Sequence, residues 1–114
     1  MIKYYILMGT VYLICDSGHD NMFKIGVTKQ PIEKRMKQLQ TGNGSEIFLV
    51  NHHETEYPYY IERMLHQRFG SDRKIGEWFE LDIEKTVDFK KYCNEYEKIV
   101  EVMKDNPFFR KNLK

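Results

Sequence analysis

Five polar side chains interrupt the apolar patterns of this sequence, and their chemical types are those that transfer protons or pair with anions. Tyr12 and Lys24 each lie within a short apolar run, in "TVYLIC" and "MFKIGVT". Arg35 borders the apolar stripe of one predicted helix, and Glu62 and His66 lie one turn apart on the next. These positions call for apolar neighbours, so the five residues are the first candidates for a functional site.

Each of these residues also has an ordinary structural explanation. Tyr12 can be a core tyrosine whose hydroxyl reaches the surface, and Lys24 can extend from a strand edge into water. Arg35 can be a solvated helix charge, and Glu62 and His66 form an i, i+4 pair that weakly stabilises a helix. No single residue indicates a function, and only the combination does.

The segments that carry these residues alternate between strand and helix patterns. Residues 10–15 and 22–28 are predicted strands, joined by a polar loop as a hairpin. Gly26 interrupts the second strand, which is typical of a close approach by another backbone or a ligand. A helix is predicted from Pro31. Its apolar stripe consists of Ile32, Met36 and Leu39.

Further elements follow along the chain. A third strand is predicted at 46–50, a second helix from Pro58 to Phe69, a short last strand or extended segment at 77–81, and a longer helix from the N-cap Asp82. The order β-β-α-β-α-(β)-α predicts an α/β (α+β) fold. We expect a small, mostly antiparallel, three-stranded central sheet flanked by helices.

Together, these motifs resemble the GIY-YIG nuclease superfamily. "TVY", ending in Tyr12, takes the place of GIY, and "KIG" at 24–26 takes the place of YIG. The family arginine matches Arg35 in "PIEKRMKQLQTGN", and the metal-binding glutamate matches Glu62 in "YYIERMLHQRF". The closing "GEWFEL" is similar to the branch found in phage open reading frames and in a meiotically up-regulated protein, where KIG replaces YIG. The resemblance covers roughly residues 9–81.

The resemblance implies an endonuclease that hydrolyses DNA phosphodiester bonds with one divalent metal ion. Glu62 would hold Mg²⁺ or Mn²⁺, Arg35 would pair with the scissile phosphate, and Tyr12 would activate or position the attacking water. A free phenol has a pKa of about 10, so a base at neutral pH needs positive charge nearby. Lys24 is the expected source of that charge. Gly26 is expected to leave room for the substrate backbone or for helix packing.

The sequence departs from the better-known members of the superfamily at three points. Lys24 replaces a second tyrosine, Gln38 and Gln40 stand where a histidine often follows the arginine, and a downstream asparagine has no obvious counterpart. We expect His66 to take over proton transfer, because an imidazole pKa near ~6.5 suits that role. The resemblance leaves open how Tyr12, Lys24 and His66 divide the work, and whether activity is retained.

The charge balance bounds the choice of partner. The net charge is +1, from 18 basic and 17 acidic residues, so only an uneven distribution can attract DNA phosphates. Basic residues concentrate around the predicted site at Lys24, Lys29, Lys34, Arg35, Lys37, Arg63, Arg68, Arg73 and Lys74. Gly26, Lys34, Lys37 and Arg63 are the expected contacts to the substrate backbone. The same charges are equally consistent with solvated helix faces.

The chain of 114 residues suits one unit. We expect a GIY-YIG-like nuclease domain at 1–81 and a C-terminal helix and tail at 82–114 that pack on it or extend it. Cys15 and Cys93 have no metal-binding spacing and are expected to be free thiols. The apolar run at 1–9 is too short for a signal peptide, and no membrane span is evident. These features predict an intracellular protein, cytoplasmic, or nuclear if the host is eukaryotic or viral.

Two alternatives come from other functional classes. The first is a catalytically inactive nucleic-acid-binding module on the same fold, motivated by the KIG variant and the missing histidine. DNA binding that persists in EDTA without cleavage would favour it. The second is an assembly module in which helix 83–104 and the aromatic "PFF" form a homodimer or bind a partner protein. Light scattering of a chain truncated after Leu81 would test the second.

Overall fold

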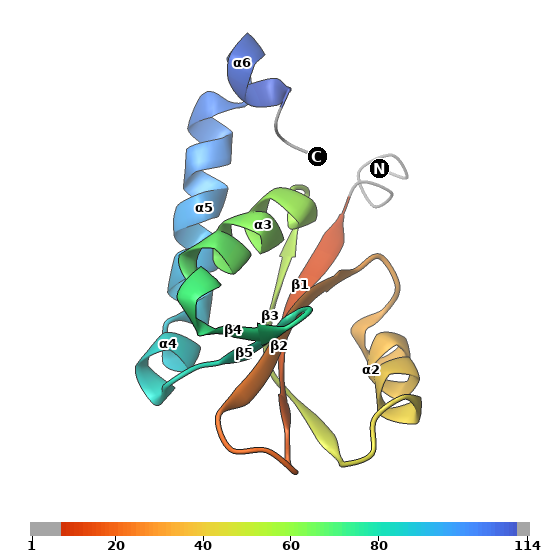
Figure 1. The fold of residues 1–114 in the computed structure, drawn as a ribbon. Coiled ribbons are helices and arrows are strands. Elements are labelled where there is room, and N and C mark those ends of the chain that lie inside the picture. The colour runs from red at the N-terminus through yellow and green to blue at the C-terminus, as the bar shows by residue number, and fades with distance from the viewer. Residues whose placement is uncertain (1–7, 112–114) are drawn as a thin grey trace.

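A five-stranded antiparallel sheet forms the centre of the molecule (Figure 1). The computed structural model describes residues 8–111, so most of the N-terminal apolar run and the end of the C-terminal tail lie outside the described residues. The strands lie in the order β3-β1-β2-β5-β4. They are β1 (Gly9–Asp16), β2 (Met22–Thr28), β3 (Ile47–Thr55), β4 (Arg73–Ile75) and β5 (Trp78–Glu80).

Helices cover both faces of this sheet (Figure 1). Helix α2 (Ile32–Thr41) lies on one face, and α3 (Pro58–Arg68) and α5 (Phe89–Met103) lie on the other. The shorter helices are η1 (Gly70–Asp72), α4 (Ile83–Val87) and α6 (Pro107–Arg110). Within residues 8–111, no helix has the length and apolar character needed to cross a membrane.

The β1–β2 hairpin decides which side chains face which helices. Tyr12 lies opposite Gly26 on β2 and opposite His52 on β3. Successive strand residues point to opposite faces of the sheet. Tyr12 therefore points toward α2, while Val11 and Leu13, the residues on either side of it, point toward α3 and α5. The register thus places the predicted catalytic tyrosine on the α2 face.

Two apolar clusters of unequal size hold the layers together. The larger lies between the sheet, α3 and α5, and its fully buried members are Val11, Leu13, Ile25, Ile61, Leu65, Phe79, Cys93 and Val100. The smaller consists of buried Tyr12, Ile14 and Ile47, against which the half-buried stripe of α2 packs. That stripe contains the predicted residues Ile32, Met36 and Leu39, so this prediction is confirmed. The two cysteines are free thiols, as predicted.

The predicted fold class is confirmed, but the sheet has five strands instead of three. The additional hairpin joins β4 to β5 through a turn in which Gly76 has a φ of +55°. Strand β4 is three residues long and fully exposed, so it carries no alternating pattern that could have revealed it. The predicted long helix from Asp82 is divided at Asp88 into α4 and α5.

The C-terminal part packs on the larger cluster through one face of α5. Phe89, Cys93 and Val100 are buried, whereas Val102 and Phe108 are 81% and 79% exposed. The short helix α6 is capped by Asn106, whose side-chain oxygen accepts hydrogen bonds from two backbone N–H groups. Nothing in the described residues shows what would cover the exposed apolar side chains, so assembly through this helix stays a prediction.

Candidate functional site

Three elements meet where the outer edge of β2 is left open. In the described part of the chain, β5 pairs with β2 only over Met22–Lys24. At the next residue, Ile25, the outer edge of β2 makes hydrogen bonds to groups outside β5. The backbone N–H of Ile25 donates to the carbonyl of Glu77 in the β4–β5 turn, at 3.2 Å. The carbonyl of Ile25 accepts a hydrogen bond from His66 on α3, at 2.9 Å. Both contacts lie next to Gly26, which places the hairpin turn and α3 beside it.

The phenol ring of Tyr12 lies directly over Gly26. A Cβ atom at Gly26 would lie 2.6 Å from Cζ of Tyr12 and would also meet its hydroxyl. The missing side chain therefore accommodates this ring, which corrects the expectation that it makes room for a substrate backbone or a helix. Tyr12 is fully buried, and its hydroxyl makes no hydrogen bond of ordinary geometry among residues 8–111, although the guanidinium of Arg35 lies within looser hydrogen-bonding reach. A buried hydroxyl without a partner is costly, and such groups are typical of sites that receive a ligand.

Arg35 is the cation that acts on this phenol. Burial raises the pKa of Tyr12 above its ordinary value of 10.0; the guanidinium of Arg35 opposes the rise, and the carboxylates of Glu77 and Glu62 add to it. The phenol is therefore protonated at neutral pH and can donate a hydrogen bond. Nε of Arg35 is also buried with no partner in the described chain, while its terminal nitrogen donates to Gln38 at 3.4 Å. A hydroxyl and a guanidinium N–H that make no well-formed hydrogen bond thus lie close together, as an anion site requires.

Lys24 has a different partner from the one expected. Its Nζ lies 3.4 Å from the carboxylate of Glu77 and 5.7 Å from the centre of the Trp78 ring. The expectation that Lys24 supplies the positive charge beside Tyr12 is corrected, because Arg35 supplies it. Lys24 instead offsets the charge of a carboxylate at the open edge.

Glu62 reaches the same edge from the opposite face of the sheet. Burial raises the pKa of Glu62 from 4.5 to about 7; the charge of Glu77 and a hydrogen bond to Glu77 add to the rise, and Lys24 opposes it. When Glu62 is protonated, its carboxyl donates a hydrogen bond to the Glu77 carboxylate. When it is ionised, two carboxylates lie side by side, an arrangement that a cation would stabilise. Tyr12, Arg35 and Glu62 are thus brought into one electrostatic neighbourhood.

His66 is held in a structural role. Its Nε2 donates to the backbone carbonyl of Ile25 at 2.9 Å, and its Nδ1 accepts from the guanidinium of Arg73 at 3.1 Å. The imidazole also packs against the ring of Phe79, with 5.0 Å between centroids. Both ring nitrogens are occupied, so the expectation that His66 transfers protons is corrected. The ring joins α3 to β2 and to the β4–β5 hairpin.

The predicted substrate-binding cations lie on the two helices that flank the open edge. Lys34 and Lys37 are exposed on α2. On α3, Arg63 lies with Arg73 and Glu62 around a shallow hollow of about 510 Å³. Positive side chains on both helices would attract a polyanion in spite of a net charge near zero.

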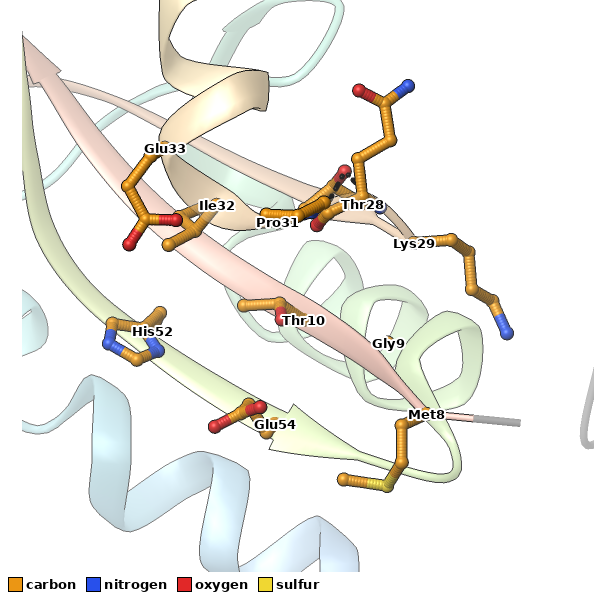
Figure 2. A pocket seen from close by; sticks show the side chains of 11 residues that line it. Met8, Gly9, Thr10, Thr28, Lys29, Pro31, Ile32, Glu33, His52 and Glu54 are labelled. Carbon is orange, nitrogen blue, oxygen red and sulfur yellow. Dashed lines mark hydrogen bonds between the residues drawn. The ribbon is translucent and has the colours of Figure 1, made fainter. Parts of the chain in front are cut away.

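A second hollow of about 500 Å³ lies on the α2 face, between the start of α2 and the ends of β1 and β3. Figure 2 shows its walls, with Thr10 on β1, His52 and Glu54 on β3, and Glu33 on α2. Its two carboxylates would repel a phosphate group. The hollow is lined by none of Tyr12, Arg35 and Glu62, so it lies outside the candidate site. Across residues 8–111, no group of three or more His, Cys, Asp or Glu side chains is arranged to hold a metal ion, either in this hollow or at the open edge of β2.

Glu77 is the site residue that sequence reasoning missed. It belongs to the "GEWFEL" motif, but a carboxylate in a turn follows no strand or helix period. A hairpin reading of "RKIGEWFE", with Gly76 at the turn, would have placed Glu77 at the tip of a strand pair.

Comparison with known proteins identifies one family. No curated protein and no solved structure matches the chain significantly. One family model does match, that of the T5orf172 domain, over residues 9–103. The match includes the sheet, the candidate site and α5. The chain therefore belongs to the T5orf172 domain family.

Proposed function

We propose that this chain is a GIY-YIG-type, divalent-metal-dependent endonuclease that hydrolyses DNA phosphodiester bonds at the open edge of β2. The observation that carries the proposal is that Tyr12, whose ring lies over Gly26, interacts electrostatically with both Arg35 and Glu62, while its hydroxyl and Nε of Arg35 are buried without a well-formed hydrogen bond in the described chain. The family match is consistent with a nuclease-like, DNA-binding module. The positive side chains on α2 and α3 fit a phosphate-backbone partner.

Glu62 and Glu77 are the residues that would hold the metal ion. Their side chains share a hydrogen bond, and the charge of Glu77 adds to the rise in the pKa of Glu62 that burial causes. One or two carboxylates suit Mg²⁺, which keeps several waters and does not need a full protein cage. When bound, the ion supplies Lewis-acid polarisation of the phosphate and stabilisation of the departing oxygen.

The chain's own side chains perform the remaining steps. Arg35 pairs with the scissile phosphate through its fork of N–H donors, including the buried Nε that has no protein partner among residues 8–111. The Tyr12 hydroxyl, which is protonated at neutral pH, donates a hydrogen bond to a phosphate oxygen or orients the attacking water, and the proton that this water loses passes to bulk water. Lys24 keeps Glu77 in place through their ion pair. Gly26 keeps the phenol ring flat against β2.

A second candidate is a nucleic-acid-binding module that does not cleave. Two observations favour it: the phenol of Tyr12 has a raised pKa, and both nitrogens of His66 are already engaged. A site without an available base binds a phosphate without activating water. Salt-sensitive DNA binding in EDTA, with no cleavage under Mg²⁺ or Mn²⁺, would select this function.

Nicking of supercoiled plasmid in Mg²⁺ tests the leading proposal. Glu62→Gln and Arg35→Ala are each expected to lower the rate by about 10²–10³-fold, the usual cost of removing one charge-stabilising group. Glu54→Gln is the matched control, because it makes the same chemical change in the hollow of Figure 2 and should leave the rate unchanged. Nicking that survives both site substitutions would discard the proposal.

A further inference from the structure

A small pocket beside the candidate site is walled by the single tryptophan of the chain. It lies between the C-terminal half of α2 and the strands, and its volume is about 220 Å³. Its apolar lining consists of Ile14, Leu39 and Ile47 together with the aromatic ring of Trp78. We call this cavity the Trp78 pocket. Pockets for drug-sized ligands measure roughly 300–1,000 Å³, so this one suits a single planar ring system.

Two contacts join the Trp78 pocket to the proposed phosphate site. Lys24 lines the pocket, lies above the Trp78 ring and pairs with Glu77 at the open edge. Gln38 also lines it, and its Oε1 accepts a hydrogen bond from Arg35 at 3.4 Å. A chain whose phosphate is bound by Arg35 would therefore have its neighbouring base beside the pocket.

The rim carries amide groups whose orientation is fixed by bonds to the protein. The Nδ2 atom of Asn43 donates to the carbonyl of Ser45 at 2.8 Å and to Asp16 at 3.3 Å, which leaves its Oδ1 as an acceptor. Gln38 uses Oε1 for Arg35, so its Nε2 is the group left to donate. A donor and an acceptor above an apolar, aromatic wall match the edge and the face of a nucleobase.

We propose that the Trp78 pocket takes one unstacked nucleobase of the substrate strand, next to the phosphate bound by Arg35. This inference rests on the proposed function, because the strand must be held at the open edge of β2. A base inside a regular duplex cannot enter, so the pocket selects single-stranded, frayed or flipped nucleotides. The occupant stacks on Trp78, and Lys24 approaches the adjoining phosphate.

Fluorescence of the full-length protein tests this directly, since Trp78 is the only tryptophan. In EDTA, a short single-stranded oligonucleotide is expected to quench the emission. A strand of the same length in which the nucleotides are abasic is expected to bind, as read by anisotropy of a dye label, without quenching. Equal quenching by both strands, or no quenching by a strand that binds, would overturn the pocket assignment. Absence of DNA binding would overturn the proposed function as well.

Substitution provides a second readout by anisotropy. Trp78→Leu is expected to weaken binding of the base-containing strand by about tenfold, a usual effect of losing one stacked base, and to leave the abasic strand unaffected. Trp78→Phe keeps an aromatic face and should retain most of the affinity. If a free nucleoside monophosphate quenches Trp78 as tightly as the strand does, the pocket serves a free nucleotide and the proposal is wrong.

Discussion

The two faces of the sheet differ in how they are packed. On one face, α3 contributes four buried residues and α5 three, and a continuous apolar cluster joins them to β1 and β2. On the other, α2 contributes none, and its half-buried stripe covers a core of three residues. Fully buried apolar side chains supply most of the folding free energy. The comparison assigns most of the stability to the first face, so the α2 face can carry the proposed site at a smaller cost in packing.

The α2 face also carries the polar features that a stable core would avoid. The hydroxyl of Tyr12 and Nε of Arg35 are buried without partners in the described chain, and the carboxyl of Glu62 reaches round the sheet to the same edge. Each costs free energy in the absence of a ligand. The folded protein tolerates this cost because the larger apolar cluster, between the sheet, α3 and α5, contains no residue of α2.

The largest expected difference between the two faces is in how far a Leu→Ala substitution lowers the free energy of unfolding. Leu65→Ala, in the fully buried cluster, should lower the free energy of unfolding by about 2–5 kcal/mol. Leu39→Ala, on the half-buried stripe of α2, should cost about 1 kcal/mol. Urea denaturation of both variants measures this, and equal costs would remove the distinction between the faces.

Adding a methyl group at Gly26 should lower the free energy of unfolding by less than the loss of Leu65 does. Gly26→Ala is expected to lower the free energy of unfolding by about 1–3 kcal/mol, because the new Cβ meets the ring of Tyr12 and displaces the phenol. Gly44→Ala is the matched control: a Cβ there meets no heavy atom within 4 Å. A cost that is the same for both variants would contradict the packing of Tyr12 on Gly26.

The half-buried carboxyl of Glu62 leads us to expect that its replacement by glutamine raises the free energy of unfolding. Its pKa of about 7 in the folded protein exceeds its ordinary value of 4.5, so the wild type loses stability as the pH rises between these values. In EDTA, Glu62→Gln should be more stable than the wild type by about 1–2 kcal/mol at pH 8, and equal to it near pH 4. Urea denaturation at both pH values measures the difference, with Glu54→Gln as control. A gain that does not depend on pH would refute the assignment.

The smallest effect concerns the polar contacts that Asp16 makes with the loop that follows α2. Asp16 accepts hydrogen bonds from Ser45, the Gly18 backbone and Asn43, which lower its pKa from 3.8 to about 2. These contacts join the β1–β2 loop to the loop before β3. Their stabilisation is complete above pH 3.8 and is lost as the pH falls through about 2.

Asp16→Asn should therefore lower the free energy of unfolding by about 1 kcal/mol at neutral pH. Urea denaturation followed by circular dichroism, at pH 7 and at pH 2, measures the difference in the free energy of unfolding between the variant and the wild type. A deficit that persists unchanged at pH 2 would mean that the charge of Asp16 is not the cause.

Local patterns of apolar residues were sufficient to predict the helices on the α3 and α5 face of the sheet and the β1–β2 hairpin. The apolar runs of β1 and β2 and the stripe of α2 predict their own positions because burial imposes a period on each. The exposed strand β4 and the break at Asp88 could not be predicted in this way, because neither changes the apolar pattern.

The candidate site was predictable only where a motif defines it. Tyr12, Arg35 and Glu62 follow from the resemblance, whereas the partners of Lys24 and His66 depend on tertiary contacts. The Lys24–Glu77 pair spans 3.4 Å in space but more than fifty positions in the chain. His66 likewise finds its acceptor on β2, which is separated from α3 by two elements, α2 and β3. Contacts of this range leave no local trace in the sequence.

Anomalous diffraction from a crystal soaked with Mn²⁺ tests the central claim most directly. The account predicts one peak at the open edge of β2, bound by the carboxylate of Glu62 with Glu77 beside it, and near the hydroxyl of Tyr12. A peak only in the hollow lined by Glu33 and Glu54, or a carboxyl of Glu62 still bonded to Glu77 with no metal at saturating Mn²⁺, would contradict it.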